Sequence, residues 1–407
     1  MVGFGRLLLE VMAGQLPDAS VILVEEPDIV RKRNVPEHMA RFPSVGQLVQ
    51  AEYVRRPGWS EAVATTLAGD HVARVVPSLE YAVPGAAELA ETLGVPGGGP
   101  AARLFCDKIE LRRLAERAGL RNPAWSEVRS ADDVRAAVAR LGTAEVVLKP
   151  ANRHGSLGVR FLTRSSDVDE AWAFTTAADE VHLLPDRPMD WRYLVEERLH
   201  GREVSVECLV SKGEIVFANP TDKLVAEGPY PVELGHVVPG PLATEHLPAL
   251  LAGMRALVGA AGFDTGVLHG EWIIGDDGPV LVECAARLPG DYIAGLIGRA
   301  YGGSFIQEYF TVMAGGSPTI AERPVRAAAI RFLTGSPGTV TRIDGRDEAE
   351  AAPGVAVCAV DTAVGRTIGE ARSSWDRLGH VIVEGADPGQ ATERAAAAAA
   401  LLRIETC

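Results

Sequence analysis

The sequence predicts a protein of mixed α/β and α+β class that is built from several domains. At 407 residues, the chain is longer than a single hydrophobic core usually supports, so two to four domains are expected. Its first hundred residues alternate buried-strand patterns with helix patterns, which favours an α/β domain. The segment that follows places helices before paired strands, which is typical of a small α+β domain.

The N-terminal region, residues 1–101, is expected to form the α/β domain. The apolar run 19–26 predicts a buried strand, and the run 70–80 predicts a second one. Residues 84–94 predict a helix that a glycine terminates. The stretch 95–102 is rich in glycine and proline and therefore predicts a domain boundary.

Residues 102–190 are expected to form the small α+β domain. Asp107 can cap a helix that ends at Gly119, and Ser130 can cap a second helix. Two strands joined by a polar loop follow within residues 146–162.

That loop has the composition of a phosphate-covering loop. Lys149 stands at its start, where a lysine offers a point charge to phosphate, and Gly155 and Gly158 allow the backbone to approach a ligand closely. The common P-loop differs, because it runs from a strand into a helix and ends in Gly-Lys-Ser/Thr. An ordinary hairpin turn is the alternative that the loop by itself leaves open.

The segment 191–318 is strand-rich, and the remaining residues, 319–407, predict a small C-terminal α+β domain. Side chains alternate between residues 203 and 210, so Val204, Val206, Cys208 and Val210 are expected on one face of a strand, and Glu203, Ser205 and Glu207 on the other. The C-terminal domain shows short apolar strands and closes with a helix over 387–405, which Asp387 can cap.

A predicted hairpin in the strand-rich segment places two acidic residues opposite each other. With a three-residue turn of Asp276, Asp277 and Gly278, Glu271 faces Glu283 across the strands. Two opposed carboxylates repel unless a cation lies between them, and Mg²⁺ takes oxygen ligands of this kind. A slipped register, with one glutamate directed toward solvent, is the alternative.

Composition narrows the class of protein further. The net charge of −14 argues against a nucleic-acid surface, and no stretch is long and apolar enough to span a membrane. The N-terminus lacks the basic start of a secretory signal. Five scattered cysteines form no C-x-x-C pair, so neither zinc nor a disulfide framework is indicated. A cytoplasmic protein with reduced thiols is expected.

Six motifs occur in the order found in one superfamily. They are Asp107-Lys108, "VVLKP", "RHGSLGV", "LVEERLHGREVSV", "GEWII" and "LVECAARLPG". In this order the chain resembles the ATP-grasp superfamily, and most of all its carboxylate–amine ligases, which form peptides from L-amino acids. The likeness covers about residues 102–302. The tail looks like the small C-terminal domain of biotin-carboxylase-type members.

The resemblance implies an ATP-grasp fold with four parts. Residues 1–101 would be a Rossmann-like α/β domain, and residues 102–190 a small lid. Residues 191–318 would be a large lid that carries the metal site, and residues 319–407 a small α+β domain. The two lids clamp ATP, and the family uses Mg²⁺, for which Mn²⁺ can substitute.

The resemblance also assigns a nucleotide site, in which two lysines hold phosphates, a flexible loop covers them, a hinge reads adenine and Glu203 bonds the ribose. The residues that it places around ATP are Lys108, Lys149, His154, Gly155, Ser156, Gly158, Glu196, Glu197, Leu199 and Glu203. It matches Glu271 and Glu283 to the metal ligands. The alternatives are that Lys108 is a solvated first-turn residue and that the acidic cluster is a polar strand face.

Two departures from the family pattern affect the substrate site. Many members carry an asparagine two residues after the second metal glutamate, where this chain has Ala285. Arg287 follows instead, as in the amino acid ligase branch, and would neutralise the transferring phosphoryl group or bind a substrate carboxylate. A structural pair between Arg287 and Asp291 is the alternative. The chain also opens on Gly3-Phe4-Gly5, where such folds have a strand.

Other residues complete the expected substrate site. Glu80 ends a predicted strand and could bind a substrate ammonium group, or it could be a surface residue. His236 is expected to contact phosphate or the attacking amine, with a structural role as the alternative, and Lys223 to touch substrate or be solvated. Gly290 is expected beside the substrate. Trp191 and Trp272 are expected in the core.

The sequence therefore predicts a ligase that joins a small carboxylate, expected to be an amino acid, to an amine. ATP would phosphorylate the carboxylate, and Lys149, Arg287 and His236 are the catalytic candidates. The partners are small molecules, not nucleic acid or membrane, and the resemblance leaves a homodimer open. Biotin-type carboxylation, loading of a carrier-protein thiol and a non-catalytic ATP-binding partner are the alternatives.

Overall fold

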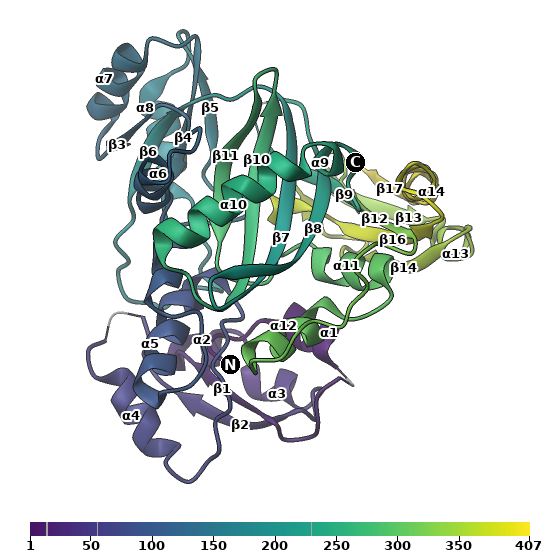
Figure 1. Cartoon of the computed structure of the whole chain (residues 1–407). Helices are drawn as coiled ribbons and strands as arrows, with labels where there is room; N and C mark the ends of the chain where they lie inside the picture. Colours follow the sequence, from purple (N-terminus) through teal and green to yellow (C-terminus); the bar gives the residue numbers. More distant parts are fainter. Residues whose placement is uncertain (14, 55, 229) are drawn as a thin grey trace.

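We describe a computed structural model of the chain, which covers residues 1–13, 15–54, 56–228 and 230–407. The N-terminal region lies at the bottom of Figure 1. Its elements are α1 (Arg6–Met12), β1 (Val21–Glu25), α2 (Pro27–Lys32), α3 (Val35–Met39), β2 (Val45–Gln50), α4 (Trp59–Thr66), the 3₁₀ turn η1 (Glu80–Ala82), α5 (Val83–Leu93) and the 3₁₀ turn η2 (Pro100–Phe105).

The strand expected over residues 70–80 does not form. β1 pairs in parallel with β2, and Val2 makes isolated parallel bridges to Val24 and to Pro77. A single bridge partner is too little pairing for a strand, and Pro77 has no backbone N–H to donate. Glu80 therefore opens η1, and its side chain is buried.

The small lid is a four-stranded sheet, ordered β3-β6-β4-β5, that is flanked by helices. Asp107 accepts hydrogen bonds from the backbone of the first helical turn, and Ser130 caps the second helix, so both expected caps are confirmed. The elements are α6 (Lys108–Arg117), β3 (Trp125–Val128), α7 (Ala131–Leu141), β4 (Glu145–Pro150), β5 (Arg160–Thr163), α8 (Val168–Ala177) and β6 (Tyr193–Glu197). β6 falls within the range expected for the large lid, but it belongs to this sheet because it pairs with β3 and β4.

The large lid contributes the first five strands of an eight-stranded sheet, ordered β11-β10-β7-β8-β9-β12-β16-β14. α10 crosses one face of this sheet in Figure 1, while α11 and α12 pack with a second apolar cluster. The elements are β7 (Arg202–Ser211), β8 (Glu214–Val225), β9 (Glu233–Val238), α9 (Pro241–Glu245), α10 (Leu247–Ala261), β10 (Gly266–Gly275), β11 (Gly278–Ala285), α11 (Ile293–Tyr301) and α12 (Phe305–Met313).

The alternation expected along β7 is confirmed. Val204, Val206, Cys208 and Val210 belong to the cluster beneath α10. Because successive side chains of a strand point to opposite faces, Glu207 faces away from that cluster. Its carboxylate is nevertheless fully buried.

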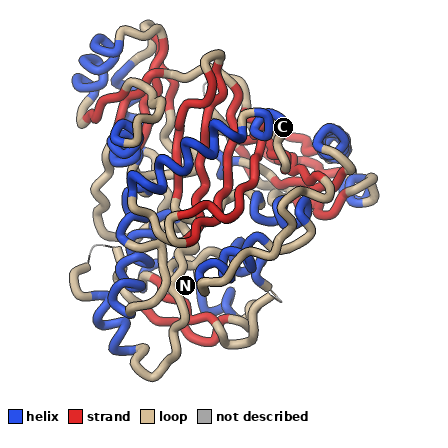
Figure 2. The backbone as a smooth tube through the Cα atoms, viewed as in Figure 1, coloured by secondary structure: helices blue, strands red, loops and turns tan. Residues whose placement is uncertain are grey.

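The C-terminal region continues the same sheet, because β12 pairs with β9. Its elements are β12 (Ala327–Leu333), β13 (Gly338–Asp344), α13 (Arg346–Glu350), β14 (Val355–Val360), β15 (Thr367–Ile368), the 3₁₀ turn η3 (Ser374–Asp376), β16 (Gly379–Gly385), α14 (Pro388–Leu401) and β17 (Arg403–Thr406). Helices, strands and loops are distinguished in Figure 2. No helix in the described part of the chain is long and apolar enough to cross a membrane.

The final helix is shorter than expected. Asp387 caps α14 as predicted, but the helix ends at Leu401 and Leu402 is extended. Residues Arg403–Thr406 then form β17, which pairs antiparallel with β13. The pattern of residues 387–405 does not reveal this ending, because the sheet pairing comes from a strand about 60 residues away.

Candidate active site

The β10–β11 hairpin brings two glutamates together, although its turn differs from the expected one. Glu271 pairs with Glu283, so the predicted register is confirmed at this position. Gly275 pairs with Gly278, however, so the turn contains two residues and not three. A bulge at Val282 adds the residue that restores the pairing of the glutamates.

A buried arginine holds this bulge. Arg112 on α6 has no solvent exposure, and its Nη2 donates to the carbonyl of Val282 at 2.6 Å. Its Nη1 donates to the carbonyl of Leu281 at 3.2 Å, and its Nε lies 2.5 Å from Glu196 Oε1. One guanidinium group therefore connects α6 to strand β6 and to the β10–β11 hairpin.

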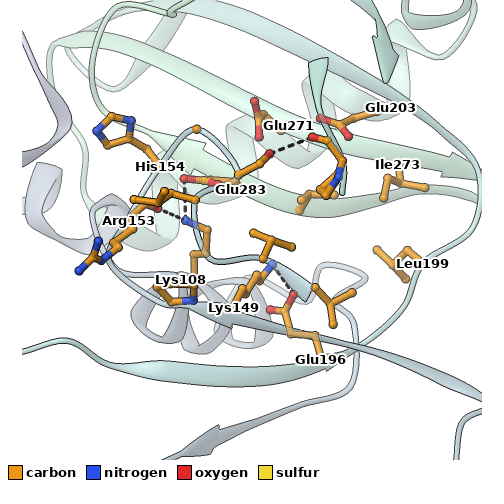
Figure 3. A pocket seen from close by; sticks show the side chains of 18 of the residues that line it. Lys108, Lys149, Arg153, His154, Glu196, Leu199, Glu203, Glu271, Ile273 and Glu283 are labelled. Carbon is orange, nitrogen blue, oxygen red and sulfur yellow. Dashed lines mark hydrogen bonds and ion pairs between the residues drawn. The ribbon is translucent and has the colours of Figure 1, made fainter. Parts of the chain in front are cut away.

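A cavity lies between the two lids, and most of the expected nucleotide residues line it. Figure 3 shows acidic side chains of the large lid facing the lysines of the small lid. The expected residues in its lining are Lys108, Lys149, His154, Gly155, Ser156, Glu196, Glu197, Leu199, Glu203, Glu271, Glu283 and Arg287. Gly158 lies outside this lining, and its φ of 72° explains why a glycine is needed there.

Both expected phosphate lysines are buried and paired with acids. Lys108 Nζ donates to the carbonyl of Arg153 at 2.6 Å and to Glu283 Oε1 at 3.0 Å, so the solvated alternative is wrong. Lys149 Nζ lies 2.5 Å from Glu196 Oε2. Burial alone would raise the pKa of Glu196, but the charges and hydrogen bonds of Arg112 and Lys149 lower it to about 2.

The loop after β4 covers one side of the cavity. β4 and β5 do form an antiparallel hairpin, and its long connection carries Gly155 with a φ of 67°. Ser156 Oγ donates to the carbonyl of Pro231 at 3.0 Å, and the ring of His154 lies between those of Tyr81 and Trp375. The loop thus contacts three other parts of the chain.

His154 is neutral in this closed arrangement. Burial and the nearby cations lower its pKa to about 3. Glu180 lies 3.7 Å from Nε2, but it accepts hydrogen bonds from Tyr81 and Trp375, and burial raises its own pKa. Glu180 therefore does not offset the lowering of the pKa of His154.

Lys223 sits within a cluster of three glutamates. Its ammonium group lies 3.3 Å from Glu203 and 2.6 Å from Glu233, and it also contacts Glu271. The lysine side chain is 1% exposed, so the solvated alternative is wrong. Burial and the neighbouring acids raise the pKa of Glu203 to about 7, despite the opposing charge of Lys223.

The carboxylates of this site fit a divalent cation. Oxygens of Glu203, Glu233 and Glu271 lie within 4.8 Å of one another, and Glu283 faces Glu271 from the next strand. Mg²⁺ binds through one or two carboxylates together with nucleotide phosphates. The ammonium groups of Lys108 and Lys223 contact the two expected metal ligands.

A second cavity of about 530 Å³ opens beside the first, toward the N- and C-terminal regions. Glu80, Lys223, Arg287 and Gly290 line it, as expected for substrate residues. Arg287 Nε lies 2.5 Å from Glu80 Oε2, so the expected alternative of a pair with Asp291 is wrong. Glu80 is buried, and its surface alternative is also wrong.

His236 has a different position from the one expected for a catalytic residue. It is not among the described residues that line either cavity. Its Nε2 lies 3.1 Å from Asp291 Oδ2, and Arg377 holds the same carboxylate through two hydrogen bonds. This arrangement favours the structural role over contact with substrate. Trp272 is in the core, as expected.

Besides Arg112, three polar residues around Lys223 and Glu271 were not singled out from the sequence. Glu233 contacts Lys223, His269 lines both cavities, and Glu207 lies 2.9 Å from His269. Hydrogen bonds and charges of Glu207 and Glu271 raise the pKa of His269 to about 9, although burial opposes this. A histidine two residues before Glu271, on the same strand face, was the available signal. The sequence around Glu233 carries none.

Two protein families match separate parts of the chain. Residues 143–295 match the ATP-grasp domain, and residues 331–406 match the C-terminal domain 2 of L-amino acid ligases. The chain thus contains an ATP-grasp domain and a domain that matches L-amino acid ligases. Both matches agree with the resemblance that its motifs predicted.

The L-amino acid ligase of Bacillus licheniformis has the same fold, with a TM-score of 0.75 and 19% identity over 95% of this chain and 93% of that one. A relative from Sinorhizobium fredii, the uncharacterized protein y4rH, is 25% identical over 86% of this chain and 74% of its own length. The D-alanine–D-alanine ligase of Bordetella avium is 31% identical over 36% of this chain and 42% of that ligase. The chain thus matches less than half of that D-alanine ligase.

Proposed function

We propose that this ATP-grasp protein is a ligase that forms an amide bond between an amino acid and an amine. ATP would phosphorylate the substrate carboxylate, and the amine would displace phosphate from the acyl phosphate. ADP, phosphate and an amide would be the products. The match to an L-amino acid ligase domain over residues 331–406 supports this choice among the chemistries of the superfamily.

The observation that carries the proposal is the buried ion pair between Arg287 and Glu80. It lines the second cavity, and Arg287 also lines the nucleotide cavity. An α-amino acid carries a carboxylate and an ammonium group, which complement the arginine and the glutamate respectively. An amino acid bound across this pair would present its carboxylate beside the nucleotide cavity, where phosphoryl transfer requires it.

The lining of the first cavity supports a set of nucleotide roles. Lys108 and Lys149 would contact phosphates, the backbone around Glu197 would contact adenine, and Glu203 would bond the ribose. A Mg²⁺ ion held by Glu271 and Glu283 would supply charge neutralisation to the phosphates. Arg287 would neutralise the charge that develops on the transferring group. Catalysis of this kind consists mostly of positioning and electrostatic stabilisation.

The test is a phosphate-release screen with ATP and Mg²⁺ over amino acids, singly and in pairs, followed by mass spectrometry. We expect phosphate release to depend on an amino acid, and the product mass to equal the sum of both substrates less water. Bicarbonate-dependent phosphate release without an amide product would contradict the proposal and favour carboxylation.

A variant of Glu283 tests the metal assignment. Glu283→Gln should abolish ADP formation while circular dichroism and the melting temperature show a folded protein. Asp277→Asn is the matched control, because it changes an exposed carboxylate in the turn of the same hairpin, and it should keep its activity. Near-normal turnover by Glu283→Gln would refute the assignment.

A further inference from the structure

A buried polar network lies directly beside Glu271, and Glu207 is its centre. Glu207 is on β7, where it pairs across strands with His269 on β10 and with Asn219 on β8. Its side chain has no solvent exposure. A carboxylate buried in this way is costly unless both of its oxygens accept hydrogen bonds.

Four donors surround the Glu207 carboxylate. Oε1 accepts from Ser205 Oγ at 2.7 Å and from His269 Nδ1 at 2.9 Å. Oε2 accepts from Asn219 Nδ2 and from Thr221 Oγ1, each at 2.7 Å. All of these donors are on strands of one sheet, so the carboxylate has a single supported orientation.

His269 connects the Glu207 carboxylate to the cavity. Its Nε2 lies 3.1 Å from Glu271 Oε1, and the residue lines both cavities. Each ring nitrogen of His269 thus lies within hydrogen-bond distance of its own glutamate. The imidazole ring therefore links a fixed, fully buried carboxylate to one that lines the cavity between the lids.

We propose that Glu207 and His269 are positioning residues that hold Glu271 in the orientation that receives the divalent cation. The inference rests on the proposed function, because it takes Glu271 as a metal ligand. In proteins, the hydrogen-bond partners of metal ligands orient those ligands, and removing such a partner typically lowers metal affinity by roughly 10–100-fold. A purely structural network would affect stability and leave metal affinity unchanged.

The decisive variant is Glu207→Gln, which keeps the size and one acceptor of the side chain. The new amide group can find an acceptor, because Asn219 Oδ1 is buried and has no hydrogen-bond partner. ADP binding is measured by titration calorimetry with Mn²⁺ and again in EDTA, and bound Mn²⁺ is counted by electron paramagnetic resonance. We expect the Mn²⁺-dependent affinity to fall by roughly 10–100-fold, while ADP affinity in EDTA is unchanged.

Glu308→Gln is the matched control. Glu308 is also a buried glutamate that accepts two hydrogen bonds, from the backbone N–H of Thr319 at 2.7 Å and from its hydroxyl at 2.8 Å. It lines neither cavity. This variant should lose stability but bind Mn²⁺ and ADP as the wild-type protein does, which separates stability from metal positioning.

Three results would overturn the inference. Wild-type Mn²⁺-dependent affinity in a folded Glu207→Gln protein shows that the network does not position Glu271. If that variant does not fold, Thr221→Val removes only one of the four hydrogen bonds; a several-fold loss of the same affinity is expected, and no loss overturns the inference. Wild-type protein that binds ADP equally well in Mn²⁺ and in EDTA would instead refute the metal assignment, and the inference with it.

Discussion

Arg112 should be the residue whose loss most damages the framework of the site. Arg112→Met keeps much of the apolar stem but removes every hydrogen bond of the guanidinium group. The carbonyls of Leu281 and Val282 then lose a donor, and Glu196 keeps only Lys149 as a cationic partner. Breaking a buried ion pair from one side typically costs about 3–5 kcal/mol. We expect a loss of about 4 kcal/mol in the free energy of unfolding.

The assay is urea denaturation at pH 7, in which the slope of each transition is compared so that the same unfolding event is measured. Arg113→Met is the matched control, because this neighbouring arginine is on the same helix but is 44% exposed and pairs with Glu110 on the surface. Its loss should cost less than about 1 kcal/mol. Equal effects of the two substitutions, or a loss below about 1 kcal/mol in Arg112→Met, would refute the reasoning.

The pH dependence gives an independent check on Arg112. The folded-state pKa of Glu196 is lowered to about 2, so its stabilising contribution is present above the unfolded pKa and is lost as pH falls through about 2. Without Arg112 the pKa of Glu196 rises, so its buried carboxylate takes up a proton at a higher pH. The variant then loses the cost of an under-neutralised buried charge. The stability gap between variant and wild type should therefore narrow as pH falls from 7 toward 4.

Three further predictions concern the loop, the acidic cluster and a turn. His154 stays neutral in the closed loop with a pKa of about 3, so closing the loop costs about 1.4 kcal/mol at pH 5.5 relative to an open loop with the ordinary value of 6.5. ADP affinity should therefore fall more steeply on acidification in wild type than in His154→Gln, because Glu203 titrates in both proteins. Lys223→Met removes the ammonium group that neutralises Glu203, Glu233 and Glu271. The melting temperature of this variant should fall in EDTA and recover partly in MgCl₂. An equal loss in both buffers would count against a metal site. Gly345→Ala should lower the urea midpoint strongly, because its Cβ would lie 1.9 Å from the carbonyl of Leu401 at a φ of 80°, whereas Gly365→Ala, with open space, should lower it less.

Features that depend only on neighbouring residues, such as helix caps and the faces of a strand, were predicted from the sequence. Asp107 caps its helix, and the valines and the cysteine of β7 share one face, because both features depend on neighbouring residues. The pairing of Glu271 with Glu283 was predicted correctly, although the predicted length of the turn was wrong. The real turn is one residue shorter, and the bulge at Val282 adds one residue to the strand, so the register at the glutamates is the same. A bulge depends on its partner, here Arg112, which lies 170 positions away in the chain.

Contacts between distant segments account for the rest. The resemblance to a family supplied the nucleotide residues, but no pattern near Glu80 reveals that Arg287 is its partner. The same holds for β17, whose strand partner β13 begins at Gly338. The fold class and most of the expected residues that line the cavity between the lids could thus be predicted from the sequence, whereas the ion pairs of the site required the three-dimensional structure.

Those ion pairs suggest how the site would accept a charged ligand. Each cation expected to contact substrate is already paired with an acid: Lys108 with Glu283, Lys149 with Glu196, Lys223 with Glu271 and Arg287 with Glu80. A nucleotide alone would take the lysines and leave buried carboxylates unpaired, and a metal alone would leave buried ammonium groups unpaired, both of which are costly. A divalent cation and a nucleotide that arrive together would exchange both sets of partners at once, so we expect the site to bind the metal–nucleotide complex more tightly than either component.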